Sequence, residues 1–421
     1  MSQGERDTRQ GETTTLKVPG QPKEMGYFLR VADHAPLTAD VLAAGMGNRP
    51  LVGLFCGLVP EELVLASGAM PVRLCGGPRK RNPASEGLLP AQCCPVVRAI
   101  AEGLLPGGDL YGRVEALVAP IVCDWKYKLA DVLETYYPVL RLHVPEDASD
   151  EDWRTELRKL SDWLARLSDQ EATPKLIDAA SEVVRSARLA YHRLLELRRE
   201  HPPPITGHDM LLVMNTYLRC DVGRWTEHCQ RLGRELERRL ERGDEWLAQQ
   251  SHGRLSKDAV RVLLTGSPTF WPHRDIVSLL EEMGCIVVAE DICSAGRLRL
   301  AACASAWDYP PEGQSCCLCA GPAELRRSIE STLDCASTYD VDGVVFHLWR
   351  GCSVQHMRLD KLCAALEAKQ IRHIVLESDP SQELNVDETR EAFAGFVLDL
   401  RGHLRAEEEA ADTEGTPNGR T

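Results

Sequence analysis

The sequence lacks several features that would assign it to common functional classes. Its 421 residues contain no run of about 18 apolar side chains, so we expect no membrane-spanning helix. It also lacks a basic surplus, because 49 Lys and Arg stand against 63 Asp and Glu and the net charge is −14. Such a chain has no basic stripe for phosphates. We therefore expect neither a membrane nor a nucleic-acid partner.

Two further absences concern localisation and nucleotides. The N-terminal stretch MSQGERDTRQGETTTLK has no apolar core of the kind that a secretory signal peptide needs. The strand-turn-helix pattern LLTGSPTFW (263–271) has neither the glycine fingerprint of dinucleotide-binding folds nor the lysine of a phosphate-binding loop. We therefore expect a cytoplasmic protein that does not bind nucleotides.

Cysteine, by contrast, is abundant, with 16 residues. Cytosolic thiols stay reduced, so metal or redox chemistry is favoured over a disulfide framework. Free cysteine is also often a small buried apolar residue. We expect that structural role for the cysteines on apolar faces of predicted helices or within predicted strands, which are Cys220, Cys229, Cys285, Cys303, Cys335 and Cys363.

Short apolar runs of the buried parallel-strand type occur in two separate blocks. Helical patterns lie between the runs, and each β-α-β-α series predicts an open parallel sheet with helices on both faces. The fold class is therefore α/β with two similar lobes. The runs are LVGLF (51–55), PVRL (71–74), VEALVAPIV (114–122) and VLRLHV (139–144), then RVLLTG (261–266), CIVVAED (285–291), DGVVFHL (342–348) and IRHIVLES (371–378).

A long charged segment separates the two blocks. Its apolar residues recur at spacings of three and four with acidic and basic residues outside, which predicts a helical insertion. Both ends of the chain are polar and are expected to be disordered tails. The expected division is a tail over 1–24, a first lobe over 25–147, a helical region over 148–257, a second lobe over 258–402 and a tail over 403–421.

Four cysteines share one expected location in the two lobes. Cys56 and Cys123 follow predicted strands of the first lobe, and Cys293 and Cys352 follow predicted strands of the second. Ligands of open parallel sheets bind beyond the carboxyl ends of the strands. These four cysteines are therefore candidate ligands.

Two further groups of cysteines stand just before predicted helices, where the helix N-terminus lowers a thiol pKa and favours the metal-binding thiolate. QCCPVVRAI offers Cys93 or Cys94, and SCCLCAGPAELRR offers Cys316, Cys317 or Cys319. Only Cys316 and Cys319 form a zinc-type knuckle, and no second knuckle matches it. That pair could also be a redox dithiol, but no suitable strand precedes it. Single cysteines from several strand ends instead suit an iron–sulfur cluster held between domains.

Glu61 and Glu62 stand in the first turn of a predicted helix shortly after Cys56. The helix dipole favours negative charge there, so capping is their ordinary role. The alternative is a catalytic role, in which one of them donates a proton beside the cluster.

Taken together, several motifs resemble the 2-hydroxyacyl-CoA dehydratase / benzoyl-CoA reductase superfamily over about residues 25–402. No one of them is specific alone. The resemblance implies Rossmann-like lobes, a helical region and an iron–sulfur cluster in the cleft. The motifs are FCGLVPEELVLASGAMPVRL, CCPVVRAI, PIVCDWKYKLADVL, GSPTFWPHRDIVSLLEEMGCIVVAEDICSAGR, DGVVFHLWRGCSVQHMRL and a late TREAF at Thr389–Phe393.

The resemblance further implies a reductase component that receives low-potential electrons from an ATP-hydrolysing iron–sulfur activator. Two branches compete. Dehydratase-type subunits carry one [4Fe-4S] cluster on three cysteines and act on acyl-CoA thioesters, whereas the double-cubane branch carries an [8Fe-9S] cluster on six cysteines in a homodimer that reduces a small substrate. Six thiol positions favour the double-cubane branch. They are Cys56, Cys94 (or Cys93), Cys123, Cys293, Cys317 (or Cys319, then Cys316) and Cys352. A non-catalytic α/β binding or electron-transfer protein is the remaining alternative.

Overall fold

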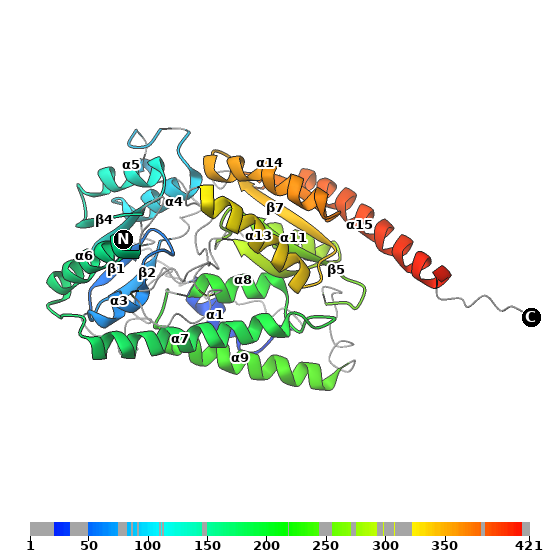
Figure 1. Cartoon of the computed structure of the whole chain (residues 1–421), viewed down its shortest axis with the longest axis horizontal. Helices are drawn as coiled ribbons and strands as arrows, with labels where there is room; N and C mark the ends of the chain where they lie inside the picture. The colour runs from blue at the N-terminus through cyan, green and yellow to red at the C-terminus, as the bar shows by residue number, and fades with distance from the viewer. Residues whose placement is uncertain are drawn as a thin grey trace, which may run out of the picture.

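The computed structural model shows two α/β lobes joined by a helical region (Figure 1). None of the helices in the ranges that it describes combines the length and apolar character needed to cross a bilayer. The structure describes residues 21–33, 49–74, 82–85, 87–90, 92–108, 111, 113–144, 150–217, 219–243, 255–270, 275–292, 298, 307, 322–379 and 384–414.

The first lobe is built on a four-stranded parallel sheet in the order β2-β1-β3-β4. Side chains alternate between its faces, so Leu117 and Ala119 of β3 pack with α4 and α5, whereas Val118 packs on the side of α3. The elements are β1 (Leu51–Leu54), α3 (Glu61–Ala66), β2 (Met70–Arg73), a short 3-10 helix η1 (Pro83–Ser85), α4 (Pro95–Leu104), β3 (Ala116–Ile121), α5 (Asp124–Leu133) and β4 (Val139–His143).

The second lobe repeats this topology with the order β6-β5-β7-β8, again all parallel. Every residue of β5, β6 and β7 is buried, which explains why their sequences are mostly apolar and do not alternate with polar residues. The elements are β5 (Val260–Gly266), α11 (Asp275–Glu282), β6 (Cys285–Ile292), α13 (Pro322–Thr338), β7 (Gly343–Trp349), α14 (Ser353–Ala368), β8 (Arg372–Ser378) and α15 (Val386–Glu414).

The helical region runs along one side of both lobes (Figure 1). Three of its helices begin at capping side chains: Thr173, Thr206 and Asp221 each accept a hydrogen bond from the backbone N–H three residues on. The helices are α1 (Met25–Asp33), α6 (Asp150–Ser168), α7 (Pro174–Leu197), α8 (Gly207–Thr216) and α9 (Val222–Arg242).

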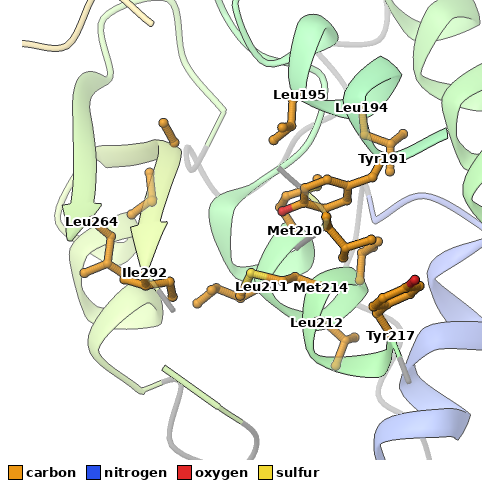
Figure 2. Close-up of a cluster of buried hydrophobic side chains, with 14 of the residues drawn as sticks. Tyr191, Leu194, Leu195, Met210, Leu211, Leu212, Met214, Tyr217, Leu264 and Ile292 are labelled. Atoms are coloured by element: carbon orange, nitrogen blue, oxygen red, sulfur yellow. The ribbon is translucent and has the colours of Figure 1, made fainter. Parts of the chain in front are cut away.

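Helix α8 fills the space between the second sheet and α7, so the helical region shares one core with the lobe beside it (Figure 2). The side chains that meet there are Met210, Leu211, Leu212 and Met214 of α8, Leu264 and Ile292 of the sheet, and Tyr191, Leu194 and Leu195 of α7.

The expected α/β architecture with two parallel-sheet lobes and a helical insertion is confirmed. Two details differ from the expected division. Helix α1 lies within the range assigned to the first lobe but packs on α8 of the helical region. Helix α15 continues past residue 402 to Glu414, so ordered helix replaces part of the expected tail.

Candidate functional site

The sheet orders locate the ligand-binding edge of each lobe. In each sheet, successive strands are added first on one side of the starting strand and then on the other. The order therefore switches between β1 and β3 in the first lobe and between β5 and β7 in the second. Parallel sheets bind ligands beyond the carboxyl ends at such a switch point. Cys56 follows β1, Cys123 follows β3 and Cys352 follows β7, so three predicted ligands lie at the two switch points.

Cys94 and Cys352 meet where the lobes contact each other. The Cys352 side chain hydrogen-bonds to the Cys94 sulfur, although the two residues belong to different lobes. Around them, Ala99 of α4 packs with Phe270, Trp349 and Cys352 of the second lobe. The contact thus joins the first turn of α4 to the strand ends of the other sheet.

The chain bends sharply just before Cys352. Gly351 has φ +87°, a left-handed conformation that glycine adopts without strain, and a side chain there would lie 3.6 Å from the Gln92 carbonyl oxygen. A second left-handed glycine, Gly266, ends β5, and a Cβ atom there would overlap the His347 carbonyl oxygen. Gly266 therefore lets two backbone segments approach closely, whereas Gly351 is needed for its left-handed conformation, since a Cβ there would make only an ordinary contact.

The loop after β5 is bonded onto the end of β7. The Ser267 hydroxyl accepts a hydrogen bond from the Trp349 backbone N–H at 2.9 Å, and the Trp349 indole donates to the Pro268 carbonyl oxygen at 2.9 Å. These bonds fix the end of β7. From there the chain continues to Cys352, the N-cap residue of α14.

Three of the predicted cysteines are N-cap residues of helices: Cys94 of α4, Cys123 of α5 and Cys352 of α14. A helix N-terminus carries partial positive charge and stabilises a thiolate. The hydrogen bond from Cys352 lowers the pKa of Cys94 to about 6; burial opposes this, while the Val97 and Val96 amides and Lys126 assist it.

The neighbouring Cys93 has the opposite environment. Burial, followed by the negative charge of Cys94, raises the pKa of Cys93 to about 12, and its thiol donates to the Cys94 carbonyl oxygen at 3.5 Å. Cys93 packs into the core of the first lobe against α4 and α5. Of the two adjacent thiols, Cys94 therefore has the environment suited to a ligand.

Lys126 of α5 places a positive charge near the Cys94 thiol. The residue is only 9% exposed, and its ammonium group favours the Cys94 thiolate. Lys126 is three residues after Cys123, so α5 brings both an N-cap cysteine and a cation to the edge of the first sheet.

Cys56 is buried two residues beyond β1, beside the strand that leads to Cys123. Helix α3 follows it, and Glu61 and Glu62 in its first turn are also buried. Glu62 forms an ion pair with Arg188 of α7, with Oε1 2.7 Å from Nη2, and Glu61 accepts a hydrogen bond from the Tyr217 hydroxyl at 3.0 Å. Both carboxylates thus face the helical region.

The cysteines expected to be structural lie within the protein interior or on helix flanks. Burial raises the pKa of Cys220 and of Cys285 to about 12, and raises that of Cys229 and Cys363 as well. Cys335 is buried in α13. The predicted ligand Cys293 and the candidates Cys316, Cys317 and Cys319 lie outside the described residues, as does Cys303.

Two polar residues of α14 were missed by the sequence analysis. Gln355 and Arg358 are buried and share one helix stripe with the apolar Leu362 and Leu366. Arg358 donates to the Thr332 hydroxyl at 2.6 Å, and that hydroxyl in turn bonds Asp291 near the end of β6. The available signal was the spacing, because polar residues at 355 and 358 continue the buried stripe toward Cys352.

The cysteines that the structure brings together would supply only some of the ligands of a metal centre. Within the described ranges, no group of three or more His, Cys, Asp and Glu side chains is arranged to hold a metal ion. What those ranges do contain is a pair of facing thiols at two helix N-termini, with a lysine charge beside one of them. Such thiolates fit as part of the ligand set of an iron–sulfur cluster.

A profile of the family described as 2-hydroxyglutaryl-CoA dehydratase, D-component, matches residues 56–397. The chain belongs to this family. It is therefore a 2-hydroxyacyl-CoA dehydratase-type subunit, a component of an enzyme, and the resemblance drawn from the sequence motifs is confirmed.

Similar proteins include the putative dehydratase subunit YjiM of Escherichia coli strain K12, 25% identical over 83% of this chain and 91% of that protein. The beta subunit of (R)-phenyllactyl-CoA dehydratase from Clostridium sporogenes is 23% identical over 80% of this chain and 88% of its own length. A benzoyl-CoA reductase polypeptide from Thauera aromatica is 24% identical over 58% of this chain and 61% of its own length.

Proposed function

We propose that this subunit is an iron–sulfur reductase component that receives low-potential electrons from an ATP-hydrolysing activator and reduces a small substrate at a cysteine-bound cluster of the double-cubane type. When bound, the cluster supplies one-electron chemistry at low potential. The protein's part is to hold the thiolates, to compensate their charge and to exclude water.

The observation that carries this proposal is the contact between Cys94 and Cys352. Each of these cysteines is the N-cap residue of a helix, and the two helices come from different lobes. A cluster bound there would bridge the lobes and neutralise two facing thiolates. The buried Lys126 would offset part of the remaining negative charge.

The proposed ligand set extends this pair. Cys56 and Cys123 are at the carboxyl edge of the first sheet. Cys293 directly follows Ile292, the last residue of β6, and Asp291 of that strand is anchored through Thr332 to Arg358 of α14. Cys317 completes the six, with Cys319 as its alternative.

The alternative function is a 2-hydroxyacyl-CoA dehydratase subunit with one [4Fe-4S] cluster acting on an acyl-CoA. It is favoured by the likeness to a beta subunit of (R)-phenyllactyl-CoA dehydratase over most of both chains. A cytoplasmic homodimer accompanies the first proposal, and a heteromeric partner accompanies the second.

Glu61 or Glu62 is the proposed proton source. Arg188 lies 2.7 Å from Glu62 and 3.6 Å from Glu61, so Glu62 is the more tightly paired of the two. The hydrogen bond from the Tyr217 hydroxyl makes Glu61 the better candidate, since a tyrosine can pass a proton to it. This role is separable from cluster binding, because neither carboxylate is needed as a ligand.

The test is to purify the protein anaerobically and to measure iron and acid-labile sulfide per chain. About eight irons would support the double-cubane proposal and about four the single-cluster alternative. A colourless protein without iron or sulfide would overturn both. The activator proposal is tested by adding such an ATPase with ATP, which should reduce the bound cluster, while omitting ATP should not.

A further inference from the structure

Gln355 is a buried amide whose oxygen has no hydrogen bond in the described part of the chain. Only 1% of its surface is exposed, and its Oε1 atom is fully shielded and has no partner. Buried side-chain amides are nearly always hydrogen-bonded, so such a group indicates a partner that the described part of the chain does not supply. Rotating the amide by half a turn exchanges its oxygen and nitrogen, so the same position can present an N–H donor.

Arg358 already occupies several of the polar groups beside this stripe of α14. Arg358, one turn further along α14, donates to the Thr332 hydroxyl at 2.6 Å, to the Ser328 carbonyl oxygen at 3.1 Å and to the Thr265 hydroxyl at 3.3 Å. Gln355 stands on the same buried stripe, and its oxygen takes no part in these bonds. It therefore lies between this network and Cys352.

The helix geometry gives the direction of the Gln355 side chain. Side chains of an α-helix point back toward its N-terminus, and Gln355 is three residues from the N-cap Cys352. Along the axis this separation is only ~4.5 Å, because an α-helix rises about 1.5 Å per residue. From this geometry we expect the amide to point toward the N-terminal end of α14, where Cys352 lies.

We propose that the Gln355 amide donates an N–H···S hydrogen bond to a sulfur of the cluster bound at Cys352 and thereby raises its reduction potential. Reduction adds negative charge to the cluster, so a donor stabilises the reduced form more than the oxidised form. Gln355 is then a positioning and tuning residue. This inference rests on the proposed function.

The experiment compares Gln355→Met with the wild-type chain. Methionine matches the length of glutamine and packs readily but offers no N–H donor. After anaerobic purification, iron content should be unchanged. In an EPR-monitored redox titration, the ratio of reduced to oxidised cluster at a fixed potential should fall about tenfold, which is ~59 mV for a one-electron couple.

Two companion variants keep the result interpretable. Gln355→Glu retains the size and an acceptor oxygen but not the donor, so its potential should fall at least as far. Gln230→Leu removes an exposed amide from α9 and should leave the potential unchanged. In cluster-free protein, Gln355→Met should leave the melting temperature equal or higher, because the amide oxygen has no partner among the described residues to lose.

The possible results separate this inference from the proposed function. A wild-type chain that binds no iron overturns both. A wild-type chain with a cluster, together with a Gln355→Met variant whose potential is unchanged, overturns only the hydrogen bond. A lower melting temperature of the cluster-free variant with an unchanged potential shows a purely structural glutamine and also overturns the inference.

Discussion

Arg198 holds Glu290 in a two-bonded ion pair in the interior, with Nη1 2.6 Å from Oε2 and Nη2 2.7 Å from Oε1. Neither side chain is more than 3% exposed. Burial alone would lower the pKa of Arg198, but the charge and hydrogen bonds of Glu290 outweigh it and raise that pKa. The pair fastens the end of α7 to β6, the strand that precedes Cys293.

Removing one partner of this pair should therefore be costly. Arg198→Met leaves the Glu290 charge buried, and we expect the free energy of unfolding to fall by ~3–5 kcal/mol. Denaturant titration measures this, and the double variant with Glu290→Gln should recover part of the loss. The control is Arg372→Met, which breaks an exposed pair with Asp399 and should change stability by less than ~1 kcal/mol. Equal effects of the two single variants would contradict the account.

Gly266 should be irreplaceable at the end of β5. Its φ of +106° disfavours any side chain, and a Cβ atom would overlap the His347 carbonyl oxygen. We expect Gly266→Ala to cost at least ~1–3 kcal/mol of folding free energy. In contrast, Gly395→Ala, where nothing lies within 4 Å of the added Cβ, should be stabilising by ~0.5–1 kcal/mol. Thermal unfolding of both variants checks this, and a fully stable Gly266→Ala protein would show that the turn is not strained.

The α/β architecture could be predicted because buried parallel strands have an unmistakable pattern. Each of the eight predicted strands is present, and β8 matches its predicted run to within one residue. The end of α15 could not be predicted as well, because the polar run after residue 402 resembles a tail in composition. Similarly, α1 has an apolar face whose partner, α8, lies far away in the sequence.

For the candidate site, the sequence located several cysteines at strand ends and helix starts, but not their surroundings. Adjacent Cys93 and Cys94 cannot be ranked by position, because their difference arises from burial of one and from contact of the other with Cys352. Gln355 was hidden for a related reason: its significance depends on which polar groups Arg358 already occupies, and these come from two other elements, β5 and α13.

The ion pair of Glu62 with Arg188 should stabilise the contact between α3 and α7 without affecting the cluster. Both side chains are buried, so Glu62→Gln should lower the free energy of unfolding by ~3 kcal/mol or more and leave iron content unchanged. Glu182→Gln removes an exposed partner of Arg185 on the same helix and should have no measurable effect. Loss of iron in Glu62→Gln protein that remains folded would mean that the pair acts on the cluster site after all.

The two adjacent cysteines before α4 should behave differently. Cys94→Ser removes the thiol that contacts Cys352, so we expect most of the bound iron to be lost. Cys93→Ser alters a thiol that is packed in the core and has a raised pKa, so iron content should persist, with a modest loss of stability of ~1–2 kcal/mol. Iron analysis and denaturant titration of both variants check this, and the reverse outcome would assign the ligand to Cys93.

The central claim is that thiols at the meeting of the two lobes hold an iron–sulfur cluster, and the measurement that tests it most directly is iron per chain in Cys352→Ser against Cys363→Ser. Both cysteines belong to the same stretch of chain, but Cys352 caps α14 and contacts Cys94, whereas Cys363 lies within the helix. Anaerobically purified Cys352→Ser protein should lose its iron and remain folded, and Cys363→Ser protein should keep the wild-type content. Retention of iron by Cys352→Ser, with loss from Cys363→Ser, would contradict the account.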